Sequence, residues 1–333
     1  MNVPDLTVAV VTYNGRELAL TTLRSALENA GPIAVEWFVA DNGSSDGTAD
    51  AVASELPDVT VFRCDNLGFA HGNNVVLQHA RGRYVLLMNP DIEIERGTLA
   101  ALVAALDERP DVGAASVIQR GTAGHVLPSI RRFPSPIRNL AEALFATRLP
   151  WLRKLQEHDK ELDTYFDERA ADWVSGAFLI ARREAVEDAG LLDEQFFLYS
   201  EEVDWCLRIR RAGWDIRHLP VMEIVHHEGP VTPARVAEEC HSRLLYARKH
   251  FSRGRALATH GALAVKHALR LTLLAVPAFL RPALRHRLRC EAYGLAVLIG
   301  AMKPPLSTAA RRVVAGCTAN RGESRAGHER VTP

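Results

Sequence analysis

The amino-acid sequence predicts an α/β protein: a doubly wound, mainly parallel sheet with flanking helices, followed by a basic helical C-terminal region. Three observations favour this class. Short Val-rich apolar runs alternate with stretches of helical periodicity from residue 6 to residue 117, which is typical of parallel sheets with helical crossovers. Polar, glycine-containing turns follow several of these runs. Residues beyond 234, by contrast, are rich in Leu, Ala and Arg without a strand pattern.

The first part of the pattern predicts five strands and four helices. We expect strands at 6–12, 35–40, 59–62, 84–88 and 112–117. We expect helices at 16–30, 49–56, 69–80 and 98–107. Asn14, followed three positions later by Glu17, resembles a capping box that would start the first of these helices.

The second part begins with a long irregular region. Residues 119–172 are rich in Arg, Pro and aromatic side chains and have weak periodicity, so we expect substrate-side loops with short helices. Regular patterning returns at 173–180, with predicted helices at 182–189 and 203–212 and predicted strands at 216–219 and 221–227. The chain then reads as helical from 233 to 302, and we expect a frayed end at 311–333.

The net charge of zero conceals two oppositely charged parts. Residues 1–234 hold 22 Lys and Arg against 35 Asp and Glu, and residues 235–333 hold 18 against 5, which makes the parts −13 and +13. We therefore expect a body at 1–234 and a basic helical extension at 235–333. A basic extension of this kind can bind nucleic acid, an anionic membrane surface or the acidic body of the same protein.

Two apolar stretches of this extension bear on membranes. Residues 271–280 and 292–302 are each short of the roughly 20 apolar residues that a membrane span needs, so interfacial helices are the better membrane interpretation. Residues 1–11 lack a secretory pattern. The five cysteines are odd in number and scattered, which fits a reducing cytoplasm better than a disulfide framework or a zinc site.

Polar residues follow three of the predicted strands, at the sheet edge where ligands of doubly wound proteins bind. They are Thr12-Tyr13-Asn14, Asp41-Asn42 and Asn89-Pro90-Asp91. Asp41 opens a polar, glycine-containing octapeptide that ends at Thr48 and would accept hydrogen bonds from a base. The alternative is a plain turn with an N-cap.

The stretch from Asn66 to Asn74 would open a helix, whose backbone N–H groups suit a phosphate; ordinary capping is the alternative. Asp91 can bind Mg²⁺ or Mn²⁺ while diphosphate and water supply the other oxygen ligands, or it can simply end a strand. His226 lies at the end of an apolar run and can complete a metal site, although a polar strand end is the commoner explanation.

A second acidic group follows the run 195–200. Glu201, Glu202 and Asp204 lie within four residues, so mutual repulsion raises at least one pKa, as suits a general base. The alternative is acids favoured by a helix N-terminus, with Asp204 paired to Arg208 four residues on.

Six motifs occur in a specific order: Val10-Val11-Thr12-Tyr13-Asn14, Asp41-Asn42-Gly43-Ser44-Ser45-Asp46-Gly47-Thr48, Asn66-Leu67-Gly68-Phe69-Ala70, Asn89-Pro90-Asp91, Trp173-Val174-Ser175-Gly176-Ala177 and Tyr199-Ser200-Glu201-Glu202-Val203-Asp204-Trp205. Together they resemble the family 2 glycosyltransferases, particularly the rhamnosyltransferase-like branch, over roughly residues 5–230. The resemblance implies the glycosyltransferase A fold, a nucleotide-sugar donor, a divalent cation, and inversion at the anomeric carbon. It makes 1–234 the catalytic domain.

The resemblance also implies roles for individual residues. Glu202 would be the base, with Glu201 and Asp204 as further catalytic candidates. Asp91 would bind the metal and His226 the metal or diphosphate. Substrate-binding residues would be Thr12, Tyr13, Asn14, Asp41, Asn42, Asp46, Asn66, Gly68, Phe69, Asn73, Asn74, Asn89 and Trp173, with Gly176 and Ala177 beside the acceptor. The chain departs from the family's pattern twice, because Asn89 replaces the first Asp of the metal motif and Glu202 replaces an Asp.

The implied donor is dTDP-rhamnose, with a UDP-sugar next, and the acceptor a cell-wall or surface glycan, lipid-linked, at the inner face of the cell membrane. We expect no nucleic-acid partner. A sugar nucleotidyltransferase would carry a glycine-rich, Arg-containing loop where this chain has Thr12 to Arg16. A processive synthase would carry a Gln-x-x-Arg-Trp motif and membrane spans, and we expect neither in this sequence. A catalytically impaired nucleotide-sugar-binding or scaffold protein stays open because of Asn89 and Glu202.

Overall fold

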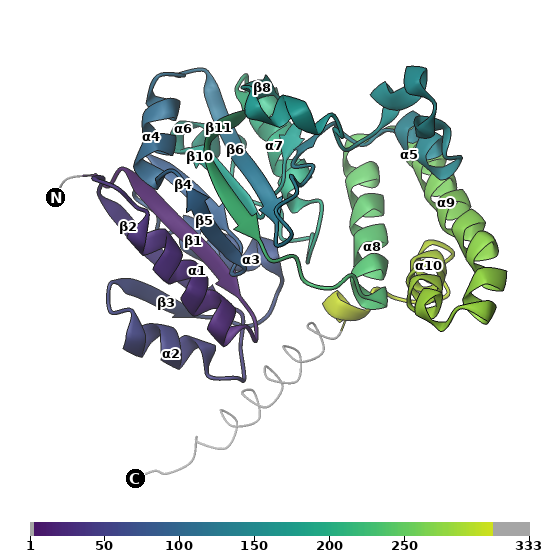
Figure 1. Cartoon of the computed structure of the whole chain (residues 1–333), viewed down its shortest axis with the longest axis horizontal. Coiled ribbons are helices and arrows are strands. Elements are labelled where there is room, and N and C mark those ends of the chain that lie inside the picture. Colours follow the sequence, from purple (N-terminus) through teal and green to yellow (C-terminus); the bar gives the residue numbers. More distant parts are fainter. Residues whose placement is uncertain (1–2, 309–333) are drawn as a thin grey trace, which may run out of the picture.

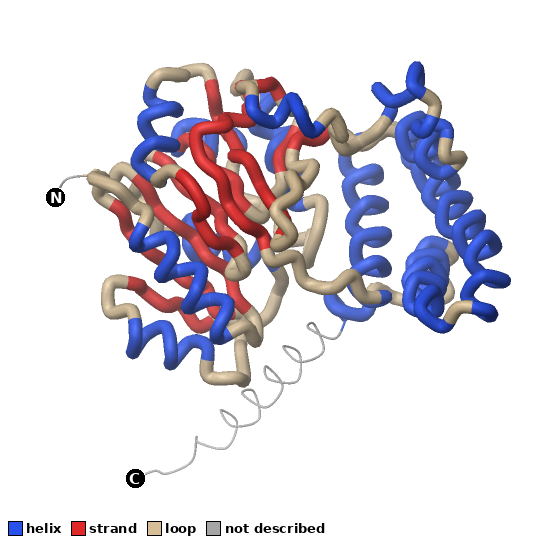
Figure 2. The backbone as a smooth tube through the Cα atoms, viewed as in Figure 1, coloured by secondary structure: helices blue, strands red, loops and turns tan. Residues whose placement is uncertain are grey.

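A computed structural model describes residues 3–308, and its centre is a nine-stranded mixed sheet with helices on both faces (Figures 1 and 2). The path through the sheet is β3 (Val59–Arg63), β2 (Val35–Asp41), β1 (Leu6–Thr12), β4 (Tyr84–Met88), β10 (Phe178–Arg182), β6 (Val112–Gly121), β11 (Asp215–His226) and β5 (Ile92–Arg96), with β8 (Arg169–Ala170) beside β11. A separate two-stranded ribbon joins β7 (Ile130–Arg131) to β9 (Trp173–Val174).

Strand directions confirm the predicted doubly wound, mainly parallel sheet. Strands β1 to β4 run parallel, and so do β6 and β11. Strand β10 lies antiparallel between β4 and β6, and β5 and β8 are antiparallel to β11. Because β10 runs against its neighbours, the turn that precedes it meets the end of β4.

Two apolar layers hold helices against the sheet. On one face, α1 (Arg16–Glu28), α2 (Thr48–Glu55) and α4 (Leu99–Asp107) bury residues such as Leu23 and Leu102 against Val8 and Leu86. On the other, α3 (Phe69–Leu77), α6 (Arg183–Ala189) and α7 (Glu201–Arg211) form a second core around the fully buried Trp205. Burial of both sheet faces explains the near-continuous apolar runs.

The remaining helices gather at one side of the sheet (Figure 1). They are α5 (Pro136–Ala143), α8 (Pro233–His250), α9 (Arg253–Leu280) and α10 (Arg285–Leu298), with the short helices η1 (Ala146–Arg148), η2 (Pro150–Leu155), η3 (Leu162–Phe166) and η4 (Pro282–Leu284). Helix α5 packs on α9, and α10 on both α8 and α9. Helix α8 contacts the catalytic body: Ser242 donates a hydrogen bond to the Leu198 carbonyl at 2.8 Å.

Several expectations need correction. Strand β5 was not predicted, and the two strands expected at 216–219 and 221–227 form one bulged strand, β11. Helix α7 begins at Glu201, two residues before the predicted start. The expected capping box is absent, because Gly15 is the N-cap of α1 and makes no side-chain cap. The Asn14 side chain instead accepts a hydrogen bond from the Ser45 amide at 2.8 Å.

The expectation about membrane spans also changes. Helix α9 runs unbroken for 28 residues, has a mean hydropathy of 1.5 over its most apolar window, and by length and composition alone could cross a membrane. Only 17% of that window is buried. The four cysteines within residues 3–308 are free. The frayed end expected at 311–333 lies outside the described residues.

Candidate active site

Five strand ends meet at one edge of the sheet, and three of them, those of β1, β2 and β4, were predicted there from the polar residues that follow them. Thr12 pairs with Asp41 at the ends of β1 and β2, and Met88 pairs with Val10, so β4 ends there too. His226 at the end of β11 pairs with Gly121 at the end of β6. The topology therefore brings together motifs that are up to two hundred residues apart.

The loops after β1 and β2 form one polar surface. The Ser44 hydroxyl accepts a hydrogen bond from the Asn14 amide at 2.9 Å, and one carboxylate oxygen of Asp41 accepts one from the Ser44 amide at 3.1 Å. The other oxygen of Asp41 is buried and, like the Thr12 hydroxyl, has no hydrogen-bond partner among the described residues. Tyr13 is exposed beside them. Such buried, open acceptors are what a bound base would satisfy.

Other residues predicted to bind substrate make hydrogen bonds that hold the scaffold together. Asp46 accepts hydrogen bonds from the Thr48 backbone N–H and hydroxyl and so fixes the turn that leads into α2. Asn42 donates to the Gly68 carbonyl at 3.1 Å. Asn74 exchanges two hydrogen bonds with Leu192. These contacts favour structural roles for all three residues.

The loop before α3 lies directly against the segment that precedes α7. Gly68 has φ +105°, and a Cβ placed on it would lie 2.2 Å from the Phe197 carbonyl oxygen. That carbonyl accepts a hydrogen bond from the Phe69 amide at 2.8 Å, so this amide is not free for a phosphate. Asn73 donates to the Phe69 carbonyl, and its own buried oxygen has no hydrogen-bond partner among residues 3–308. Asn66 is partly exposed in the loop.

The metal candidates Asp91 and His226 lie together. Oδ1 of Asp91 lies 3.3 Å from Nε2 of His226, and it is a buried oxygen with no hydrogen-bond partner within the described chain. The backbone sets this geometry, because the Asp91 carbonyl accepts a hydrogen bond from the His227 amide at 2.9 Å. Nε2 of the neighbouring His227 lies 2.5 Å from Oε1 of Glu93.

These two side chains fit a divalent cation that also takes oxygen ligands from substrate. No group of three or more His, Cys, Asp or Glu side chains with metal-binding geometry occurs within residues 3–308. A carboxylate and an imidazole would leave several positions for diphosphate and water, as Mg²⁺ and Mn²⁺ sites commonly do. The Asn89 side chain adds no charge there. The Asn89 backbone N–H donates a hydrogen bond to the Ala177 carbonyl at 2.8 Å.

Glu202 lies in the first turn of α7, after two strained residues. Tyr199 and Ser200 both have left-handed φ values, 69° and 68°, which non-glycine residues seldom adopt. Gly176 leaves room beside Glu202, since a Cβ on it would lie 3.3 Å from the Glu202 Cβ. Because Asn89 contacts Ala177, the neighbour of Gly176, the metal side and the acidic helix start adjoin one turn.

The environment of Glu202 suits a base. Oε2 of Glu202 is buried and has no hydrogen-bond partner in the described part of the chain. Burial raises the pKa of Glu202, and the charges of Arg131 and Arg243 oppose that rise in part. Glu201 is only 4% exposed, and burial, aided by the Glu202 charge, raises its pKa well above the usual range. A carboxyl kept neutral in this way is a poorer base.

Asp204 has a different environment. Its side chain is fully buried and lies 2.9 Å from Arg208, 2.7 Å from Lys249 and 2.7 Å from His250. Burial alone would raise the pKa of Asp204, but the hydrogen bonds from His250 and Lys249 and the charge of Arg208 outweigh it and lower the pKa to about 2. This environment favours a structural ion-pair centre between α7 and α8 over a catalytic role.

Trp173 and Ala177 are buried at the two ends of the segment that contains the turn at 175–177. Trp173 is 3% exposed, and its indole donates a hydrogen bond to the Arg132 carbonyl at 3.0 Å. The Arg131 guanidinium lies 4.9 Å from the centre of its ring. Ala177 belongs to the buried core. Both contacts favour positioning roles.

Sequence analysis missed Arg131 and Arg243, the cations whose charges act on Glu202. Arg243 is paired with Glu157 at 2.8 Å, and Arg131 sits in the two-stranded ribbon. The Arg-rich composition of 119–172 was the only sequence signal for Arg131, and α8 was assigned to the basic extension.

A doubly wound sheet with a carboxylate, an imidazole and an acidic helix start at its carboxyl edge defines a glycosyltransferase of the A fold. Among solved structures, the mannosyltransferase PcManGT from Pyrobaculum calidifontis, in complex with GDP-Man and Mn²⁺, superposes with a TM-score of 0.55 at 20% identity, over 89% of this chain and 86% of that one. GalNAc-T7 with UDP, GalNAc and Mn²⁺ superposes with a TM-score of 0.50 at 16% identity, over 68% of this chain and 44% of that one. These similarities establish the fold.

The chain belongs to glycosyl transferase family 2, whose family model matches residues 7–188. The N-acetylglucosaminyl-diphospho-decaprenol L-rhamnosyltransferase of Mycobacterium tuberculosis is 32% identical over 243 residues, which are 68% of this chain and 77% of the relative. The rhamnosyltransferase WbbL of Escherichia coli K12 is 22% identical over 171 residues, 48% and 61% of the two chains. These relatives support the predicted rhamnosyltransferase-like branch.

Proposed function

We propose that this family 2 enzyme inverts the anomeric carbon while moving a sugar from a nucleoside diphosphate to a hydroxyl of a lipid-linked glycan. The main supporting observation is the pairing of two open carboxylates around one turn. Asp91 lies beside His226, and the backbone N–H of Asn89, two residues earlier, donates to the Ala177 carbonyl. Gly176 of the same turn lies against Glu202, whose Oε2 has no hydrogen-bond partner within residues 3–308. A leaving-group site and a base on opposite sides of a reacting carbon suit a single displacement.

In this mechanism each residue has one task. Asp41 and the Thr12 hydroxyl hold the nucleoside through their open buried acceptors. Glu202 takes the proton of the acceptor hydroxyl as that oxygen bonds to C1, and the bond from C1 to the diphosphate oxygen breaks. Asp91 and His226 would hold a divalent cation, which when bound would neutralise charge on the departing diphosphate.

Rhamnose is the first candidate for the sugar and dTDP-rhamnose for the donor, with a UDP-sugar next. Both curated relatives named above are called rhamnosyltransferases, and the name of the Mycobacterium protein specifies a sugar on a diphospho-decaprenol. An acceptor of that kind, a growing cell-wall or surface glycan on a lipid diphosphate, is the one we propose here.

We propose that the enzyme works in the cytoplasm, peripherally on the inner face of the cell membrane. The end of α9 exposes Val276, Phe279 and Leu280, which are 69, 81 and 71% exposed. Exposed arginines follow at once, at 281, 285, 287 and 289. Apolar side chains beside cations are typical of helices that lie in an anionic membrane surface.

Ion pairs in the middle of α9 favour this surface placement over a membrane span. Lys266 lies 3.8 Å from Glu142 of α5, and His267 lies 2.6 Å from Glu291 of α10. Charged groups inside a bilayer are costly, and here they join α9 to its neighbours in the protein.

A thermal-shift screen of nucleoside diphosphates and nucleotide sugars, with and without Mn²⁺, tests the donor site, because ligands of the folded state raise its stability. We expect a dTDP- or UDP-compound to stabilise the protein more with Mn²⁺, and Asp91→Asn to remove the metal-dependent part only. Stabilisation by no nucleotide would contradict the proposed donor class.

A catalytically impaired, nucleotide-binding scaffold is the second candidate, because Asn89 and Glu202 depart from the family's usual Asp residues. Donor hydrolysis or transfer by the purified protein with Mn²⁺ separates the two. Retained nucleotide binding without turnover of any donor would favour the scaffold.

A further inference from the structure

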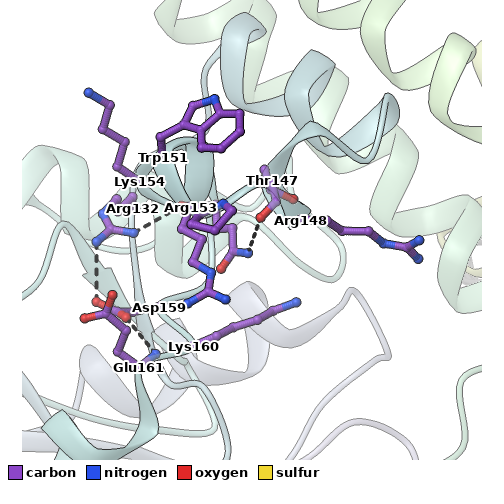
Figure 3. A pocket seen from close by; sticks show the side chains of 11 residues that line it. Arg132, Thr147, Arg148, Trp151, Arg153, Lys154, Asp159, Lys160 and Glu161 are labelled. Carbon is purple, nitrogen blue, oxygen red and sulfur yellow. Dashed lines mark hydrogen bonds and ion pairs between the residues drawn. The ribbon is translucent and has the colours of Figure 1, made fainter.

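A basic pocket lies between the short helices η1 and η2 and Arg132, the residue that follows β7 (Figure 3). Its volume is about 720 Å³. Its lining residues are Arg132, Thr147, Arg148, Pro150, Trp151, Arg153, Lys154, Gln156, Asp159, Lys160 and Glu161. None of the residues predicted to bind the donor or to act in catalysis belongs to this lining.

The charge of the lining is strongly positive. It contains five Arg and Lys side chains against two carboxylates. One carboxylate, Asp159, is already shared between Arg132 at 3.4 Å and Arg169 at 3.3 Å. Within residues 3–308, no ion-pair partner is found for the four other cations of the lining, which are Arg148, Arg153, Lys154 and Lys160. Unpaired cations around a hollow suit an anion that presents several oxygens.

An exposed Trp lines the pocket, and exposed leucines lie near it in the sequence. Trp151 in η2 is 69% exposed, and Leu144 and Leu149 are 55% and 43% exposed. Figure 3 shows Trp151 and Lys154 projecting together from η2. Exposed Trp and Leu next to Arg and Lys are characteristic of protein surfaces at the boundary between lipid headgroups and acyl chains.

The pocket connects to the acceptor side of the catalytic site through the two-stranded ribbon. Arg131 is the last residue of the ribbon strand β7, and Arg132 follows it directly. The Arg131 charge acts on Glu202, whereas Arg132 lines the pocket. The Arg132 carbonyl accepts the indole hydrogen bond of Trp173, three residues before Gly176. A molecule that extends past this end of the ribbon would thus reach both the pocket and Glu202.

We infer that this pocket binds the diphosphate group of a lipid-linked acceptor, while the sugar of that acceptor extends toward Glu202. The inference rests on the proposed function and adds the place where the acceptor's charged group is held. The cations neutralise the diphosphate oxygens, and Trp151 with the neighbouring leucines contacts the lipid.

Calorimetric titration with inorganic pyrophosphate in metal-free buffer tests the diphosphate part. We expect the double variant Arg153→Ala/Lys154→Ala to bind at least tenfold more weakly than the wild type. The matched control is Arg287→Ala/Arg289→Ala, which removes two exposed arginines outside the pocket. Circular dichroism checks that both variants fold. Equal affinity in the wild type and the pocket variant would overturn the inference.

Two further measurements distinguish a lipid diphosphate from a free one. For a polyprenyl-diphosphate-linked sugar acceptor, the pocket variant should raise KM several-fold with kcat nearly unchanged. It should also bind vesicles of phosphatidylcholine with phosphatidic acid more weakly than the wild type does. If pyrophosphate binding falls but acceptor KM and vesicle binding do not, the lipid source is wrong. If no acceptor is turned over while the pyrophosphate difference persists, the proposed function fails and the pocket assignment does not.

Discussion

Two carboxylates in one turn of α7 differ in what surrounds them, although the sequence places them only two positions apart. Glu202 has a buried oxygen with no hydrogen-bond partner among residues 3–308, whereas Arg208, Lys249 and His250 contact Asp204. The first arrangement leaves a lone pair available for a substrate proton, and the second occupies it. Position in the sequence therefore did not separate the two residues, and the tertiary neighbours did.

Glu202→Gln should abolish transfer and leave donor affinity nearly intact, because the base acts on the acceptor hydroxyl. We expect the wild-type rate to fall at acid pH through a pKa above the 4.5 of an ordinary glutamate, since burial raises the pKa of Glu202. Steady-state kinetics across pH and nucleotide titration measure both effects. The matched control is Glu201→Gln; if Glu202→Gln keeps more than a tenth of the wild-type rate, Glu201 or Asp204 becomes the better base.

Asp204→Asn should lower the free energy of unfolding by about 2–4 kcal/mol at neutral pH, because it removes the buried carboxylate that Arg208 and Lys249 pair with. The folded pKa of Asp204, about 2, lies below the usual 3.8. The stabilisation is therefore complete above about pH 4 and is lost as the pH falls toward 2, which amounts to about 2 kcal/mol. Urea unfolding between pH 3 and pH 7 measures this. An equally steep loss of stability in Asp204→Asn would contradict the assignment.

At the scale of elements, close backbone contacts hold the site loops in register. Strand β10 runs antiparallel to β4, so the turn at 175–177 meets the residues after β4. Gly68 lets the loop before α3 approach the segment before α7 within hydrogen-bonding distance. The glycine at this position is needed for a backbone contact, whereas the sequence suggested a phosphate loop.

Gly68→Ala should cost more than 2 kcal/mol of stability, because the new Cβ collides with the Phe197 backbone and because φ is positive. Gly124→Ala is the control, since Gly124 has φ +77° but no atom within 4 Å of an added Cβ. It should cost about 1 kcal/mol from backbone strain alone. Chemical denaturation compares them. Equal losses would show that the approach to Phe197 contributes nothing.

At the scale of the whole molecule, the basic extension contacts the acidic body and also leaves an apolar end uncovered. Helix α8 lies against the body, where Lys249 and His250 reach Asp204 and Arg243 reaches Glu157. Part of the +13 charge is thus paired inside the protein. The cations at the far end of α9 and the start of α10 remain on the surface.

Leu280→Asp should weaken binding to anionic vesicles about tenfold or more, because it puts a charge where an apolar side chain would enter the lipid. Leu257→Asp is a matched control, since Leu257 and Leu280 are 70% and 71% exposed at opposite ends of α9. Vesicle sedimentation measures both. The same loss in the two variants would contradict docking by the end of α9.

Much of the fold and part of the site were predictable from local pattern. Apolar runs buried on both faces located β1, β2 and β4, and the polar residues after them located Asp41 and Asp91 at the functional edge. Strand β5 was missed because it follows Asp91 directly, where a strand end was expected, although its alternating Ile and Glu residues are typical of a half-buried strand. The roles of Asn42, Asp46 and Asn74 were not predictable, because amide and carboxylate groups serve turns and ligands equally well.

By itself the sequence determined the α/β class, the first strands and helices along the chain and the six motifs of a family 2 glycosyltransferase. Hydrophobic period and turn chemistry are local, so a linear chain displays them directly. Only the tertiary structure decided that Asp91 meets His226, that Glu202 rather than Asp204 keeps a free oxygen, and that a basic pocket adjoins the acceptor side. Those outcomes depend on burial and on charges brought together from distant segments, and neither is a property of any one segment.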